Sequence, residues 1–144
     1  MSGAERLYTP ELLALAVKLA DFPLDDSLPL RGQARSKSCG STISTGIETN
    51  SGGGIARLGM RVQACAVGQA TAAIFATQAA GHDIASLERA SAQIQHWLGG
   101  NGPIPEFPGI EIIEPARAFP GRHGAMMLPW LAAIAALSSA QASG

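Results

Sequence analysis

Apolar and polar residues alternate with a period of two in two neighbouring stretches of the chain. The first places Ile43, Thr45, Ile47 and Thr49 on one side and Thr42, Ser44, Gly46 and Glu48 on the other. In the second, Leu58, Met60, Val62 and Ala64 oppose Arg57, Gly59, Arg61 and Gln63. A glycine-rich turn at residues 50–54 separates them, so the pattern predicts an antiparallel hairpin with one apolar face. We expect residues 33–38 to add a third strand.

Helical spacing describes most of the remaining chain. Thr9-Pro10-Glu11 has the composition of a helix start, and this helix is expected to end near Asp21. An extended connection is expected over residues 24–31. Further helices are predicted over residues 65–80, 83–98 and 126–140, with a short helical turn near residues 110–116. Strands followed by helices indicate an α+β fold, and the length fits one domain over residues 1–144.

Composition narrows the class of protein. The net charge of −1 and the 15% of charged residues argue against nucleic acid, which requires a basic face. The longest apolar run, residues 126–137, contains Pro129 and is shorter than the ~20 residues that cross a bilayer. Two cysteines, with a polar N-terminus and no signal sequence, are typical of a reducing compartment. We therefore expect a cytoplasmic protein with no nucleic-acid or membrane partner.

The two cysteines are the strongest candidates for chemistry. Cys39 precedes the first alternating stretch and Cys65 follows the second, so a hairpin brings both thiols to one end of the sheet. Cys65 also stands where a helix begins, and the dipole and free amide donors there favour a thiolate. Such a pair can hold a soft metal, accept sulfur, or serve only as small buried side chains. No Cys-x-x-Cys motif is present, which excludes a zinc ribbon of the usual spacing.

Histidine is the other candidate ligand. His123 lies in Gly121-Arg122-His123-Gly124, which is expected to precede the last helix, and from there it could reach a metal or an anion. The alternative interpretation is an exposed loop histidine. Neither a Ser-His-Asp spacing nor an HExxH motif is present, so the sequence carries no strong enzyme signature.

Four short segments resemble the U-type iron–sulfur cluster scaffolds, which comprise the NifU N-terminal domain, IscU and SufU. They are Tyr8-Thr9-Pro10-Glu11-Leu12, the span from Ser38-Cys39-Gly40 to Ala64-Cys65, Gly81-His82-Asp83-Ile84, and residues 122–130. The resemblance covers nearly the whole chain. It implies a SufE/NifU-like α+β fold: a three-stranded antiparallel sheet with about four to five helices packed mainly on one face.

The resemblance also implies a site, and the chain departs from it. The family's first two cysteines fall on Cys39 and Cys65, its aspartate on Ser41 and its third cysteine on Ala125. His123 is displaced by one residue from the family's histidine or lysine. A [2Fe–2S] cluster requires four ligands, and so does tetrahedral zinc. One chain offers two thiolates, an imidazole and a hydroxyl, so the ligand set that the resemblance implies is incomplete.

Three functional hypotheses follow. The first is a non-enzymatic scaffold of iron–sulfur assembly that binds iron, a [2Fe–2S] cluster or zinc, or accepts sulfur, through Cys39 and Cys65. Its expected partners are a cysteine desulfurase or other assembly proteins, and a homodimer could share one cluster. The second is a degenerate scaffold that binds no metal and regulates a desulfurase as an interaction module. The third is a Cys/His hydrolase or thiol-transfer enzyme with His123 as base.

Overall fold

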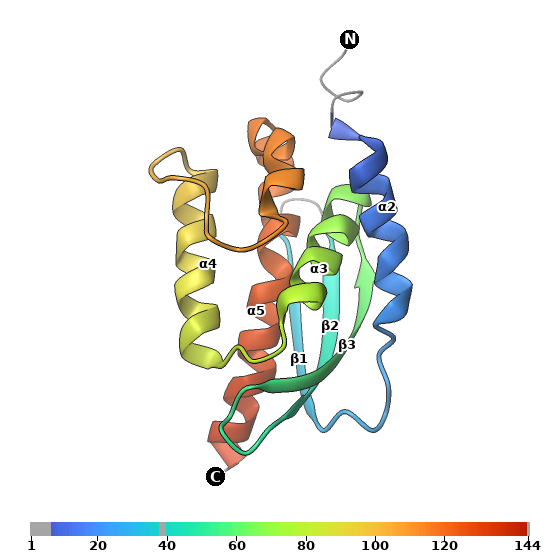
Figure 1. Cartoon of the computed structure of the whole chain (residues 1–144), viewed down its shortest axis with the longest axis vertical. Coiled ribbons are helices and arrows are strands. Elements are labelled where there is room, and N and C mark those ends of the chain that lie inside the picture. The colour runs from blue at the N-terminus through green and yellow to red at the C-terminus, as the bar shows by residue number, and fades with distance from the viewer. Residues whose placement is uncertain (1–6, 38–39, 144) are drawn as a thin grey trace.

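The chain folds into one three-stranded antiparallel sheet with helices on one face, which confirms the predicted α+β class (Figure 1). The structure is a computed structural model that describes residues 7–37 and 40–143. Its elements are α2 (Pro10–Lys18), η1 (Leu19–Asp21), β1 (Leu30–Arg35), β2 (Thr42–Thr49), β3 (Ile55–Gln63), α3 (Ala66–Gln78), α4 (Ile84–Leu98), η2 (Ile110–Ala118) and α5 (Pro120–Ser143). Helix α5 packs on β1 and β2 and α3 on β3, while α2 packs on α3 and α4 on α5.

The predicted hairpin is present and keeps the predicted faces. Ile43 pairs with Val62, Thr45 with Met60 and Ile47 with Leu58. Ile43, Thr45 and Ile47 are buried under the helices, as period-two patterning requires of a sheet with one covered face. The Thr45 hydroxyl donates to the backbone oxygen of Gly59 at 3.0 Å, so this buried polar group is satisfied.

The third strand begins three residues earlier than predicted, and the residues expected to be an extended connection supply its start. β1 pairs with β2 from Leu30, opposite Ile47, to Arg35, opposite Thr42. The chain then turns, because the Gly40 N–H donates to the Ser36 oxygen at 3.0 Å. The predicted boundaries were wrong because glycine and alanine stand at inward positions of β1, so its alternation is weak.

The last helix also begins earlier than predicted. α5 starts at Pro120, where a proline is well suited to the first helical position, rather than near residue 126. The glycines at 121 and 124 have low helix propensity, which hides this turn in the sequence. As a result, His123 lies within the first turn of α5 and not in a preceding loop.

Helix α5 is long and apolar. By these two properties alone, residues 120–140 could cross a membrane, which the shorter apolar run in the sequence did not indicate. Half of an apolar 18-residue window within this stretch is buried inside the fold, where α5 packs against β1, β2, α3 and α4. These contacts account for its apolar composition.

Side chains cap the starts of α2 and α4. Thr9 caps α2, and its hydroxyl accepts from the Leu12 N–H at 3.1 Å. Asp83 caps α4 in a capping box with Ser86, whose N–H donates to the carboxylate at 2.9 Å. This hydrogen bond lowers the pKa of Asp83. Local sequence therefore fixes where both helices begin.

The aromatic core lies between α3, α5 and the segment before η2. The ring of Trp130 is edge-on to Phe75, with centroids 5.4 Å apart, and to Phe107, at 5.1 Å. All three side chains are buried. The indole N–H of Trp130 has no hydrogen-bond acceptor among the described residues. Packing in the core, and not a hydrogen bond to a described residue, therefore holds Trp130.

Two glycines let a connecting segment cross the outer face of the sheet, the face turned away from α3 and α5. Gly46 of β2 and Gly59 of β3 are register partners. A Cβ at Gly46 would meet the side chains of Leu24 and Leu28, and one at Gly59 would meet the backbone of Pro23. The segment from α2 to β1 thus lies on the half of this face near the β2–β3 turn.

Candidate functional site

The loop from β1 to β2 and the junction from β3 to α3 lie at the same end of the sheet (Figure 1). Thr42 pairs with both Arg35 and Gln63, which makes these three residues the last row of the sheet. Cys65 follows Gln63 by two residues, and Cys39 belongs to the loop that follows Arg35. Cys39 lies outside the described residues, so its part in the site stays a prediction.

Cys65 is the N-cap residue of α3, as predicted from the small, helix-forming residues that follow it. Its backbone is extended, with φ −64° and ψ 172°, and its oxygen accepts from the Gln69 N–H at 2.9 Å. The side chain makes no capping hydrogen bond, is free of disulfides and is partly exposed. A thiol is therefore available at the positive end of a helix.

Ala125 packs against the first turn of α3. A Cβ built on Gly68 would lie 3.3 Å from the Ala125 Cβ and 2.6 Å from that of Ala64. Ala125 is completely buried, so α5 approaches α3 closely through small residues at this point. Gly68 follows Cys65 by three residues, so Ala125 packs beside the helical turn that Cys65 begins.

His123 donates a hydrogen bond to η2. Its Nε2 lies 2.7 Å from the backbone oxygen of Arg117. A carbonyl oxygen can only accept, so Nε2 carries the proton and Nδ1 of the neutral ring is the nitrogen left with a lone pair. Histidines that bind metals commonly donate their other N–H to such an oxygen. The tautomer therefore suits coordination through Nδ1, and a role as general base would need the same atom.

Ser41 is buried in the closed loop between β1 and β2. Its backbone oxygen accepts from the Ser36 N–H at 2.9 Å, and Ser41 is 5% exposed. A serine hydroxyl is a weaker metal ligand than the carboxylate that the resemblance places here. Among residues 7–37 and 40–143, no group of three or more His, Cys, Asp or Glu side chains is arranged to hold a metal.

Sequence reasoning missed two contacts at this end of the molecule. The Arg122 guanidinium donates to the Tyr8 hydroxyl at 3.2 Å and links the segment before α2 to the first turn of α5. Gly68 provides the space that Ala125 occupies. Tyr8 and Arg122 both belong to segments that carry the family resemblance, but nothing in the sequence pairs them.

Comparison with known proteins finds similarity in structure only. No protein-family model matches the sequence, and no curated protein matches it. A NifU-like protein (N-terminal) from Brucella abortus, described as nitrogen-fixing, has a TM-score of 0.88 and 25% identity, covering 99% of this chain and 100% of its own.

Two further solved structures are similar at lower identity. A candidate iron–sulfur cluster assembly scaffold protein for the SUF system, from Fervidobacterium islandicum, has a TM-score of 0.77 and 17% identity, covering 91% of this chain and 96% of its own. A hypothetical protein reaches a TM-score of 0.68 at 19% identity, covering 88% and 96%. The fold is thus shared over nearly the full length of all three structures.

Proposed function

Because this chain is a divergent member of the U-type iron–sulfur cluster scaffold family, we propose that it is a scaffold-like protein of iron–sulfur assembly. Cys39 and Cys65 bind iron or a [2Fe–2S] cluster, or zinc in its place. The observation that carries this proposal is the position of Cys65, a free thiol at a helix N-terminus at the end of the sheet from which the Cys39 loop leaves.

Sulfur transfer to the same thiols needs a donor. A thiolate of this chain attacks the terminal sulfur of a persulfide on a cysteine desulfurase, and the desulfurase thiolate leaves. The bound sulfur is then available for a cluster. The desulfurase supplies the chemistry of sulfur release, so the chain itself acts as an acceptor and not as an enzyme.

The donor set of one chain falls short of a cluster. Two thiolates are available, with His123 Nδ1 as a weaker third ligand and Ser41 in place of a carboxylate. Ala125 stands at the position of the family's third cysteine, so a methyl group replaces the thiol there. A cluster that requires four ligands is therefore completed by the two cysteines of a second copy.

Anaerobic reconstitution with iron and sulfide tests this function. The protein is expected to develop the visible absorbance of a cluster, with matching iron and acid-labile sulfide contents. The Cys65→Ala and Cys39→Ala variants should each lose it, while Thr77→Ser, on the exposed side of α3, should retain it. Zinc content, measured in parallel, separates a zinc site from a cluster site. Absence of both metals from the wild-type chain would reject the proposal.

A second candidate function rests on Ala125, a small apolar residue that stands at the position of the family's third cysteine. Ala125 is completely buried against α3, as in a core and not a ligand shell. This favours a degenerate scaffold that docks on a cysteine desulfurase without holding metal. Binding of purified desulfurase that survives the double change Cys39→Ala/Cys65→Ala, together with failed reconstitution of the wild type, would favour it over the first function.

A further inference from the structure

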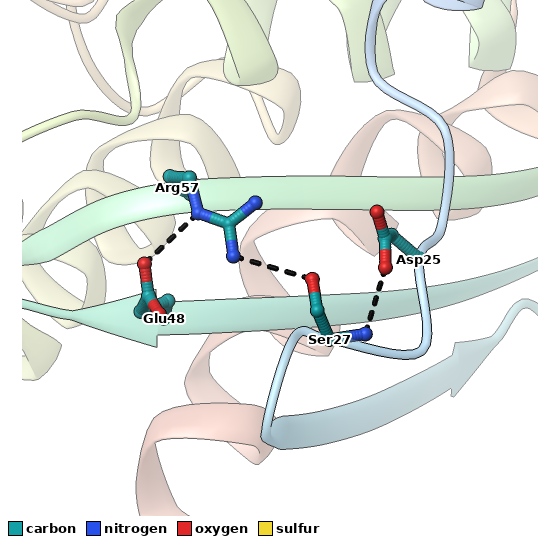
Figure 2. A network of polar contacts seen from close by, with 4 residues as sticks. All are labelled: Asp25, Ser27, Glu48 and Arg57. Atoms are coloured by element: carbon teal, nitrogen blue, oxygen red, sulfur yellow. Dashed lines mark hydrogen bonds and ion pairs between the residues drawn. The ribbon is translucent and has the colours of Figure 1, made fainter.

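The outer face of the sheet is divided into two halves of different charge. In the half near the β2–β3 turn, the cations are paired. Arg57 donates to the Glu48 carboxylate at 2.9 Å and to the Ser27 hydroxyl at 3.3 Å (Figure 2). The first contact lowers the pKa of Glu48. Arg31 donates to the backbone oxygens of Leu28 and Asp25 at 2.9 and 2.6 Å. Partners therefore already occupy these two guanidinium groups.

The half near Cys65 has cations that pair with no residue in the described part of the chain. Arg35, Lys37 and Arg61 are exposed, and no hydrogen bond or ion pair joins their side chains to any residue that the structure describes. We call Arg35, Lys37 and Arg61 the basic patch. The residues beside the patch on this half are neutral: Gln33, Thr42, Ser44 and Gln63. Since the whole chain has a net charge of −1, the rest of the chain carries −4.

The basic patch borders a hollow with hydrogen-bonding walls. A cavity of about 340 Å³ is lined by Gln33, Arg35, Thr42 and Ser44 on this half. Next to it, a cavity of about 280 Å³ is lined by Gln33, Ser44, Arg31 and Arg61. The two share Gln33 and Ser44, which are register partners, so they form one depression with arginines at both ends.

The spacing suits an extended acidic segment. Arg35 is on β1 and Arg61 on β3, about 10 Å apart across the sheet and two residues, or about 7 Å, apart along it, so their Cα atoms are separated by about 12 Å. Alternate side chains of an extended peptide are about 7 Å apart, and the long arginine side chains cover the difference between this spacing and the separation of Arg35 and Arg61. Guanidinium groups bind carboxylates with paired hydrogen bonds. No aromatic side chain stands on the outer face of the three strands, so the stacking that single-stranded nucleic acid uses is missing.

We propose that the basic patch and the hollow between its arginines bind an acidic segment of a partner protein through carboxylate–guanidinium contacts. The row Arg35–Thr42–Gln63 ends two residues before Cys65, so a bound partner lies beside the thiol. Binding of the acidic segment does not depend on the proposed function. The role of this binding, which is to bring an assembly partner to Cys65, rests on the proposed function.

Binding of a fluorescent oligoglutamate peptide tests the patch. Anisotropy titrations with the full chain should show binding at low salt that weakens at about 0.15 M salt. The double variant Arg35→Glu/Arg61→Glu is expected to lose on the order of tenfold in affinity, because two attractive contacts become repulsive. Arg35→Gln/Arg61→Gln, with circular dichroism of each variant, guards against loss through misfolding.

The matched control is Lys18→Glu/Arg89→Glu, which makes the same change in net charge at exposed positions on α2 and α4. It should bind the peptide much as the wild type does. Equal losses in the two double variants would show that only total charge matters and would overturn the proposal, as would absence of binding at low salt. Tighter binding of a single-stranded oligonucleotide of equal charge would assign the patch to nucleic acid instead. No iron or sulfide enters this assay, so it can fail or succeed independently of reconstitution.

Discussion

At the scale of single residues, Gly32 shows how closely the last helix approaches the sheet. A Cβ at this position would fall on the backbone of Ala132 and Ala136 in α5. Backbone atoms of a packed helix cannot turn aside as a flexible side chain can. Gly32 therefore sets the distance between β1 and α5, the two elements with the most extensive helix–sheet contact.

Gly32→Ala is expected to destabilise the fold by about 1–3 kcal/mol, the usual cost of overpacking, or more if α5 cannot shift. Urea denaturation followed by circular dichroism measures the change. Gly121→Ala is the matched control, because nothing lies within 4 Å of a Cβ at Gly121 and alanine favours a helix. A Gly32→Ala variant as stable as Gly121→Ala would contradict the packing described here.

Residue-level features of the candidate site were only partly predictable. The small, helix-forming residues that follow Cys65 correctly indicated that a helix begins there. The hydrogen bond from His123 to Arg117 depends on how η2 meets α5, and no local pattern records such a contact. The fit of Ala125 into the space at Gly68 likewise joins residues far apart in sequence. The part of Cys39 in the site remains a prediction, because Cys39 lies outside the described residues.

At the scale of elements, α3 is the centre of the molecule. Nine of its 13 residues are buried, and it contacts α2, α5, β3 and η2. Its Phe75 packs on Phe107 and Trp130. A helix that is buried nearly all round has weak amphipathic patterning, which is why its sequence is rich in small apolar residues.

Truncation of this aromatic contact should be costly. We expect Phe75→Ala to destabilise the fold by about 3–5 kcal/mol, since the cavity that it leaves is lined by rigid rings. Val17→Ala, at a residue on α2 that is 76% exposed, should change stability by less than about 0.5 kcal/mol. Thermal unfolding of both variants checks the contrast. Equal melting temperatures would argue against a central role for α3.

Elements with strong periodicity were predicted well, and those shaped by distant contacts were not. Strands β2 and β3 alternate clearly, so their pairing and faces followed from the sequence. β1 is held by close approach of α5 to Gly32, a contact between residues one hundred positions apart. The first turn of α5 contains two glycines and is stabilised by packing instead of helix propensity.

At the scale of the whole molecule, cluster binding should be coupled to self-association. Under the proposed function, the ligands of one chain are too few for a cluster, so reconstitution is expected to convert a monomer into a dimer in proportion to its cluster content. Light scattering after size-exclusion chromatography measures this. The species should return to monomer when a chelator removes the iron. A cluster-loaded monomer would contradict a cluster shared between two copies.

The ligand set can also be completed within one chain. Ser41→Asp/Ala125→Cys restores both positions at which the chain departs from the family pattern, and this variant should load a cluster without dimerising. Ser41→Asn/Ala125→Ser changes the same positions without a thiolate or a carboxylate and serves as the control. Dimerisation of both variants to the same extent would disconnect the missing ligands from self-association.

The burial of Trp130 gives the molecule an internal optical probe. The indole lies in a buried aromatic cluster, with no hydrogen-bond acceptor among the described residues, and Trp130 is five positions along α5 from Ala125. The second tryptophan, Trp97, is also buried. Emission from both indoles should therefore be blue-shifted, and a coloured centre near Ala125 is expected to quench this emission through energy transfer. Fluorescence of the unlabelled chain can thus follow metal arrival in real time.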